Sequence, residues 1–110
     1  MQAALQVSED YLAVTRFALN EIKKLITNIP DASIKISIDV TGISGVHPII
    51  EVDRLYDYLS DKSDYEVFLI DGVRFITNKR WIPYVKSLLL DYYEGLGRSG
   101  FVFSVKPSNV

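Results

Sequence analysis

The stretch LLLDYYEGLGRSGFVFSVKPSN, residues 88–109, says more about the fold than any other part of this 110-residue chain. Its segments "LLLDYY" and "FVFSV" are apolar and aromatic, which predicts two strands, and "GLGRSG" lies between them. These glycines also match the letters of the G-x-G-x-x-G dinucleotide loop. That loop opens a helix whose N-terminus faces the pyrophosphate, whereas here a strand pattern follows. We therefore interpret the glycines as a turn between two strands.

Alternating polar and apolar residues predict further strands upstream. Over residues 33–40, isoleucine and valine alternate with polar residues, which indicates a strand with one dry and one wet face. "TGISG" then predicts a turn, and "PIIEVD", residues 48–53, a strand that runs back. "YEVFLI" and "VRFIT" flank Asp71-Gly72, the pair typical of a type I' hairpin. Residues 2–7 predict a short first strand.

Two helices are expected. Ser8 can cap a helix that has Glu9 and Asp10 in its first turn, and that runs to about residue 27. Its apolar residues fall at helical spacing: Tyr11, Val14, Ala18, Ile22 and Leu25. Asn78 can cap a short second helix over residues 79–86. Residues 54–64 fit a helical turn or a loop equally well.

Composition limits the function classes. Residues 1–110 suit one folded domain, with 48% hydrophobic and 24% charged residues. A net charge of -2 argues against nucleic acid as a partner. The chain contains no cysteine, no long apolar run and no basic-then-apolar leader. We expect a cytoplasmic protein that does not act at a membrane.

Charge is unevenly distributed along the chain. Residues 51–66 hold six acidic residues, whereas residues 74–86 hold four basic residues and no acid. Such patches can steer a partner or form ordinary solvated surface. Both interpretations stay open, and the second is favoured.

The sequence offers little for catalysis. His47 is the only histidine, and no serine stands in a nucleophile-elbow motif. Asp53, Asp57 and Asp61 fit a solvated acidic face rather than a cation site. Asp91 lies within a predicted strand, where a structural hydrogen bond is expected. We predict no catalytic residue, no metal ligand, no cofactor and no enzyme activity.

Aromatic residues are the remaining feature of note. Tyrosine and tryptophan have amphipathic rings that are enriched at protein interfaces, although they can equally cap the core edges of a small domain. The candidate partner-binding residues are Trp81, Tyr84, Tyr92, Tyr93 and Phe101.

Residues 88–109 resemble the carboxy-terminal signature of the A-type iron-sulfur carrier family, also called HesB-like. In that family an Ile-Asp-Tyr strand, a glycine turn, a Ser-Gly-Phe-x-Phe strand and a Pro-Asn follow in order. "IKISIDVTGISG" and "FLIDGVRFITN" resemble the family's upstream strand, loop and hairpin. The resemblance implies an α+β, HesB-like domain: small mixed or antiparallel, sandwich-like sheets with one long N-terminal helix and one short helix.

The chain departs from the family at the metal site. Three cysteines hold iron or a [2Fe-2S] cluster there, and the first of these positions corresponds to Ile43, which has no lone pair for a metal. The other two lie beyond Pro-Asn, where this chain has no counterpart. A cysteine-free member implies a scaffold without its metal site.

We therefore expect a non-enzymatic protein-interaction module, an adaptor or assembly chaperone. It would bind a client protein or peptide along a free strand edge, or in an aromatic groove near Trp81, Tyr84 and Tyr92. The alternative is an auxiliary factor of iron-sulfur assembly that pairs with a cysteine-bearing carrier. A homo-oligomer is possible under either hypothesis, and a hydrolase or nucleotide-binding enzyme has no motif in its favour.

Overall fold

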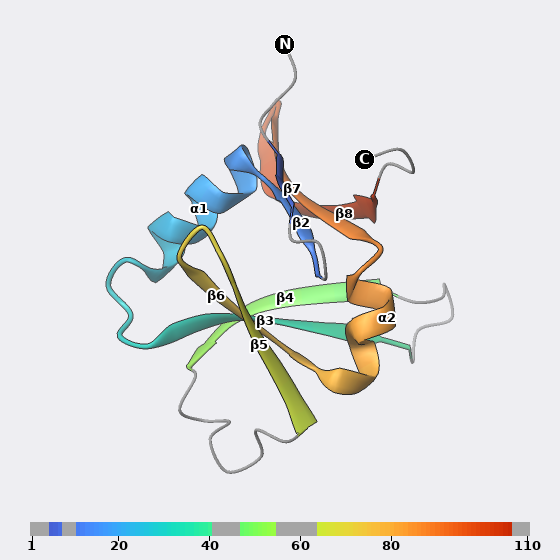
Figure 1. The fold of residues 1–110 in the computed structure, drawn as a ribbon. Helices are drawn as coiled ribbons and strands as arrows, with labels where there is room; N and C mark the ends of the chain where they lie inside the picture. The colour runs from blue at the N-terminus through green and yellow to red at the C-terminus, as the bar shows by residue number, and fades with distance from the viewer. Residues whose placement is uncertain (1–4, 8–10, 41–46, 55–63, 107–110) are drawn as a thin grey trace.

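The computed structural model describes residues 5–7, 11–40, 47–54 and 64–106, and it shows the expected α+β architecture of two four-stranded sheets and two helices (Figure 1). A 3-10 turn, η2, leads into the second helix. The elements in chain order are β1 Leu5–Val7, β2 Ala13–Thr15, α1 Arg16–Ile26, β3 Ala32–Asp39, β4 His47–Arg54, β5 Tyr65–Ile70, β6 Val73–Asn78, η2 Lys79–Trp81, α2 Ile82–Val85, β7 Leu88–Gly95 and β8 Arg98–Val105.

One sheet joins the two ends of the described chain. Its strand order is β1-β2-β7-β8, and β2 pairs with β7 in parallel while the other pairs are antiparallel. The β7–β8 hairpin pairs Leu88 with Val105 and Gly95 with Arg98. Gly97 has a positive φ of 71°, a backbone conformation that glycine adopts without steric cost. The predicted hairpin turn thus falls within "GLGRSG", although Gly95 ends β7 and residues 98–100 begin β8.

The second sheet comes from the middle of the chain. Its order is β4-β3-β6-β5, with β3 and β6 parallel and the other pairs antiparallel. The predicted strands over residues 33–40, 48–53, 65–70 and 73–77 are confirmed, although Val40 lies beyond the end of β3 and is exposed. Asp71 and Gly72 both have positive φ, 51° and 80°, which confirms the predicted hairpin turn.

The core lies between the sheets and α1. Buried residues of both sheets and of the helix form one hydrophobic cluster, which includes Val14, Leu19, Ile36, Phe75 and Leu90. The alternation predicted for β3 is observed, with Ile34, Ile36 and Ile38 buried. Mixed sheets that share one core agree with the sandwich-like expectation.

The start of the long helix is the main correction to the expected fold. Helix α1 begins at Arg16, and Ala13–Thr15 form strand β2. Val14 pairs with Leu90 of β7 and is fully buried, so a long-range strand pairing outweighs the helical spacing of the apolar residues. Leu25, expected on the core face, is half exposed. Ser8, the expected cap, lies outside the described residues.

Candidate interaction surfaces

Trp81 and Tyr84 lie together on η2 and α2. Asn78 caps this segment, because its Oδ1 accepts from the backbone N–H of Arg80 at 2.9 Å, as predicted. Pro83 falls in the first turn of α2, where its missing N–H does no harm. The two rings meet edge to face, 6.1 Å apart, and Tyr84 remains 47% exposed while Trp81 packs against the core.

Tyr92 and Phe101 form a second pair on the β7–β8 hairpin. They are cross-strand partners whose ring centroids lie 5.0 Å apart at an interplanar angle of 71°. Both pack against the edge of the hydrophobic core. Tyr93 follows Tyr92 in the strand and therefore points to the opposite face of the sheet, where it is 55% exposed.

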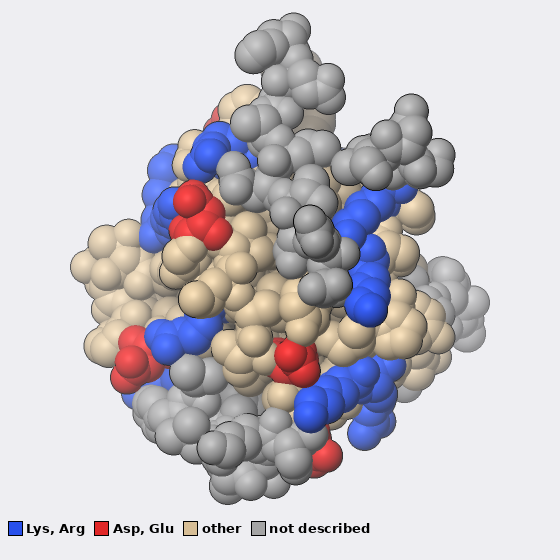
Figure 2. Space-filling model, viewed as in Figure 1, with Lys and Arg blue, Asp and Glu red and all other residues tan. Residues whose placement is uncertain are grey.

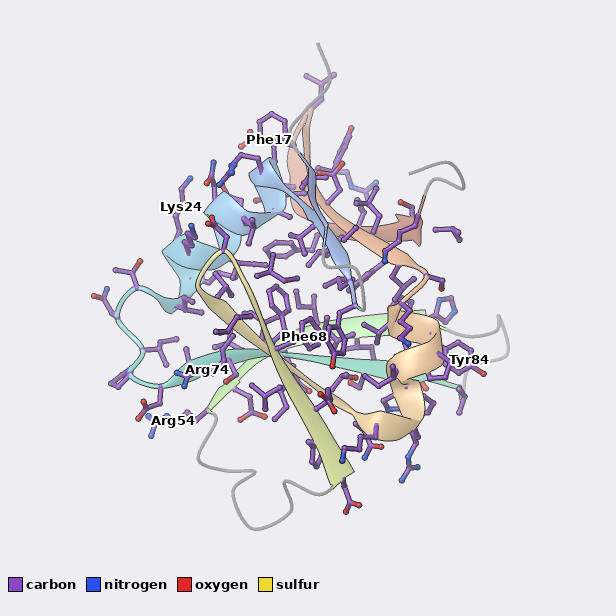
Figure 3. The ribbon with its side chains drawn as sticks, viewed as in Figure 1. Phe17, Lys24, Arg54, Phe68, Arg74 and Tyr84 are labelled. Atoms are coloured by element: carbon purple, nitrogen blue, oxygen red, sulfur yellow. The ribbon has the colours of Figure 1, made fainter. Side chains whose placement is uncertain are left out.

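The five predicted partner-binding residues thus lie in two parts of the fold, the η2–α2 segment and the β7–β8 hairpin. Figure 3 shows Tyr84 on α2 well away from Phe17 and Lys24 on α1. Tyr92 lies four residues into β7, roughly 13 Å along the strand from its start. Of the three residues of the expected aromatic groove, Trp81 and Tyr84 meet edge to face on η2 and α2, whereas Tyr92 packs against Phe101 on the hairpin. Whether any of the five residues binds a partner stays a prediction.

Sequence reasoning missed a groove between α1 and β7. It has a volume of about 650 Å³ and is lined by Phe17, Asn20, Glu21, Lys23, Lys24, Thr27, Tyr92 and Glu94. Phe17 is 63% exposed, and it shares a helix face with Glu21 and Lys24 at spacings of four and seven residues. An aromatic residue on an otherwise polar helix face was the available signal for this groove.

Ion pairs occupy much of the charge in this groove. Lys24 Nζ lies 2.9 Å from Glu21 Oε2, and this hydrogen bond and charge raise the pKa of Lys24. Lys23 Nζ lies 2.8 Å from Asp71 Oδ2, and Arg16 contacts the same oxygen at 3.1 Å. The hydrogen bond from Lys23 is the main cause of the lowered pKa of Asp71. The groove walls therefore carry both positive and negative side chains, and both lysines are in ion pairs.

The outer face of the β7–β8 hairpin carries a smaller hollow. Its volume is about 230 Å³, and it is lined by Tyr93, Arg98, Ser99, Gly100 and Val102. β8 is the edge strand of its sheet, and Val102 on its outer face is 46% exposed. An edge strand with exposed apolar side chains offers backbone groups for pairing with another chain.

The other candidate residues have structural or surface positions. Asp91 Oδ1 accepts from Thr15 Oγ1 at 2.6 Å and from the backbone N–H of Tyr92 at 2.8 Å, so the expected structural hydrogen bond is confirmed. His47 is exposed in β4 opposite Asp39. Asp53 accepts from the N–H of Arg54, and Asp57 and Asp61 lie outside the described residues.

The donor atoms of this chain do not fit an iron-sulfur cluster. The whole sequence has no cysteine, and thiolates are the ligands that such clusters require. Within residues 5–7, 11–40, 47–54 and 64–106, no three His, Cys, Asp or Glu side chains are grouped in a way that could hold a metal ion. Ile43 and the segment after Lys106 lie outside the described residues.

Three solved structures share this fold. Escherichia coli SufA, involved in the biosynthesis of iron-sulfur clusters, aligns with a TM-score of 0.71 and 18% identity over 94% of this chain and 89% of SufA. IscA, solved with a [2Fe-2S] cluster, aligns with a TM-score of 0.63 and 15% identity over 86% of this chain and 82% of IscA. A protein from Aquifex aeolicus aligns with a TM-score of 0.62 and 28% identity over 94% and 98% of the two chains.

The chain therefore has the fold of the A-type iron-sulfur carriers, the HesB-like fold, without a single cysteine. No protein-family model and no curated protein matches its sequence. The resemblance carried by residues 88–109 is confirmed at the level of fold. Divergence in the other residues is wide enough to hide the likeness from sequence comparison.

Proposed function

We propose that this chain is a non-enzymatic protein-interaction module, an adaptor or assembly chaperone built on a HesB-like scaffold. One observation carries the proposal: the fold extends over nearly the whole chain, while the thiolates that would hold a cluster are absent from the sequence. A scaffold without those ligands acts through its surfaces. A client protein or peptide is the corresponding partner.

The exposed aromatic residues and the free strand edge support this proposal. Tyr84 and Tyr93 expose large amphipathic rings, of the kind enriched at the centres of protein interfaces. Beside Tyr93, β8 is the edge strand of its sheet among the described residues, and an edge strand can pair with another chain. Trp81, Tyr92 and Phe101 support these two surfaces from beneath, because they pack against the core.

Affinity capture with matched variants tests the proposal. The purified chain is immobilised, and bound proteins are identified for the wild type, for Tyr84→Ala and for Tyr93→Ser. Leu25→Ser is the control, because Leu25 is exposed on α1 and lines neither the α1–β7 groove nor the hairpin hollow. We expect at least one protein that is retained by the wild type and the control and lost with an aromatic variant. Identical protein sets for all four chains would contradict the proposal.

The likeness to SufA and IscA supports a second candidate function. In this hypothesis the chain is an auxiliary factor of iron-sulfur assembly that pairs with a cysteine-bearing carrier. Light scattering on a mixture with purified cluster-loaded IscA would then show a complex that contains both chains. The same measurement on the chain alone reports whether it forms a homo-oligomer. If the mixture at micromolar concentration contains only the two separate proteins and no complex, this candidate function is ruled out.

A cytoplasmic location accompanies the proposed function. Within the described part of the chain, no helix is long and apolar enough to cross a membrane. Cell fractionation with an antibody against the chain checks the location.

A further inference from the structure

A basic surface covers η2 and α2. We define it by Lys79, Arg80 and Lys86, whose side chains are all exposed. Figure 2 shows blue side chains gathered at the right of the molecule, where Figure 1 places α2. Lys106 lies nearby, because its backbone N–H donates to the carbonyl of Ser87 at 2.7 Å, but its Nζ donates to the carbonyl of Tyr11 at 2.6 Å, so it is not counted in the surface.

The basic surface and helix α1 differ in how their cations are paired. Within the described residues, Lys79, Arg80 and Lys86 form no ion pair, whereas Arg16, Lys23 and Lys24 on α1 all do. Asp71 is the only acid between Glu66 and Asp91 in the sequence, and it is paired with α1. Glu66 in β5 accepts a hydrogen bond from the hydroxyl of Tyr11, with the two oxygens 2.8 Å apart.

Arg80 is held in one orientation by its neighbours. Its Nε donates to Asn78 Oδ1 at 3.3 Å, and its guanidinium carbon lies 5.7 Å from the centre of the Trp81 ring. An arginine fixed in this way loses less entropy when its terminal nitrogens bind a carboxylate in a bidentate manner. Tyr84, in contact with Trp81, adds an exposed ring beside these cations. The site thus offers one oriented fork, two flexible ammonium groups and an aromatic contact.

We propose that the basic surface of η2 and α2 docks an acidic segment of a partner protein. Carboxylates of that segment pair with Arg80 and with the two lysines, and an apolar side chain of the segment lies against Tyr84. The positive charge of the surface favours a partner segment with negative charge. The inference rests on the proposed interaction function. A protein segment is favoured over nucleic acid because the surface has few cations and the chain carries a net charge of -2.

A titration with a defined peptide tests the inference. The probe is a dye-labelled short peptide of glutamate and leucine, and the matched peptide with glutamine in place of glutamate is its control. Anisotropy of the dye measures affinity, and the fluorescence of Trp81, the only tryptophan, reports binding at this site. We expect saturable binding of the acidic peptide alone, weakened by added salt.

Charge variants locate the binding site. Arg80→Glu is expected to lower the affinity for the acidic peptide by about tenfold or more. Arg80→Lys is expected to lower it by less, because lysine keeps the charge and loses only the planar guanidinium. Arg54→Glu is the matched control, since Arg54 is exposed at the end of β4 and lines neither the α1–β7 groove nor the hairpin hollow. Thermal unfolding of each variant verifies that it is folded. Equal affinity of Arg80→Glu and Arg54→Glu would overturn the inference, and so would tighter binding to an oligonucleotide or to anionic vesicles.

The same variants separate this inference from the proposed function. If a protein captured by the wild type is captured equally by Arg80→Glu, the basic surface is not the docking site, although the chain remains an interaction module. If the capture is lost with Arg80→Glu and kept with Arg54→Glu, the inference is supported. If no protein is captured while the peptide still binds, the basic surface does bind acidic segments, and the proposed adaptor function is contradicted.

Discussion

At the scale of single residues, two buried hydroxyl groups differ in what they contribute to stability. Thr77 Oγ1 donates to the carbonyl of Ile36 at 2.8 Å, whereas Ser33 Oγ is buried and has no hydrogen-bond partner among the described residues. Both side chains are fully inaccessible to solvent. A buried hydroxyl without a partner costs about 1–3 kcal/mol, and a satisfied one contributes about 1 kcal/mol.

Substitution of the two hydroxyls should therefore have opposite effects. We expect Ser33→Ala to raise the free energy of unfolding by about 1 kcal/mol, and Thr77→Val, which preserves shape, to lower it by about 1 kcal/mol. Urea unfolding of both variants and the wild type measures the difference. A loss of stability in Ser33→Ala would show that its hydroxyl has a partner after all.

Asp71 is a second residue with a testable contribution. Lys23 and Arg16 hold its pKa below the usual value, so the folded chain binds a proton less readily than the unfolded chain does. Its stabilising effect is present above about pH 3.9, the value in unfolded chains, and is lost as the pH falls through the lower folded pKa. The effect is small, because all three side chains are solvent-exposed.

Thermal unfolding against pH tests this linkage. We expect Asp71→Asn to melt below the wild type at about pH 7, and the two melting temperatures to converge as the pH falls through the lowered pKa of Asp71. Glu51→Gln, on an exposed position of β4, is the control. A constant difference across the whole range would mean that the substitution changes the turn and not the charge.

At the scale of elements, Thr15 joins helix α1 to the sheet. Its Oγ1 accepts from the backbone N–H of Ala18 at 3.2 Å, which caps the helix, and it donates to Asp91 Oδ1 at 2.6 Å. One hydroxyl thus satisfies a helix N-terminus and a carboxylate of β7. Thr15 is also the last residue of β2, so the strand, the helix and β7 meet at this atom.

Removal of that hydroxyl should loosen the junction. We expect Thr15→Val to lower the free energy of unfolding by about 1–2 kcal/mol, and Thr15→Ser to preserve most of it, because serine caps as well as threonine does. Chemical denaturation gives the magnitudes. If Thr15→Ser were as destabilised as Thr15→Val, the methyl group rather than the hydroxyl would be the important contact.

The elements also show what the sequence can predict. Strand β3 and the Asp71-Gly72 hairpin follow from local patterns, since alternation and turn chemistry are properties of neighbouring residues. β2 is not predictable in this way, because Val14 pairs with Gln6 on one side and with the distant Leu90 on the other, and no local pattern indicates either pairing. The α1–β7 groove has the same origin: Phe17 and Tyr92 are distant in the sequence, and only the tertiary fold brings them to one cavity.

At the scale of the whole molecule, the fold and the donor atoms give opposite indications about iron-sulfur chemistry. The scaffold resembles SufA and IscA over most of its length, and the sequence supplies no sulfur donor other than one methionine thioether. Fold was predictable because residues 88–109 keep their turn and strand pattern. The surface that we propose around Arg80 was less predictable, since it depends on which charges the fold leaves unpaired.

Anaerobic reconstitution with iron and sulfide tests the consequence for cluster binding. We expect the purified chain to remain colourless after desalting and to contain no stoichiometric iron, because thiolates are the donors that hold such clusters. IscA treated in parallel is the positive control. Visible absorbance and iron analysis are the measurements, and a brown product with bound iron would overturn the interaction-module proposal.

The pairing of β2 with β7 spans 76 residues and sets an order of events during synthesis. The sheet of β3 to β6 is complete in the growing polypeptide once residue 78 has left the ribosome, whereas β2 must wait for β7 to gain its second neighbour. Until then, one edge of β2 and the inner face of the finished sheet lack their partners. Nascent chains stalled before β7 should therefore be susceptible to proteolysis near Ala13, and those stalled well after β8 should resist it.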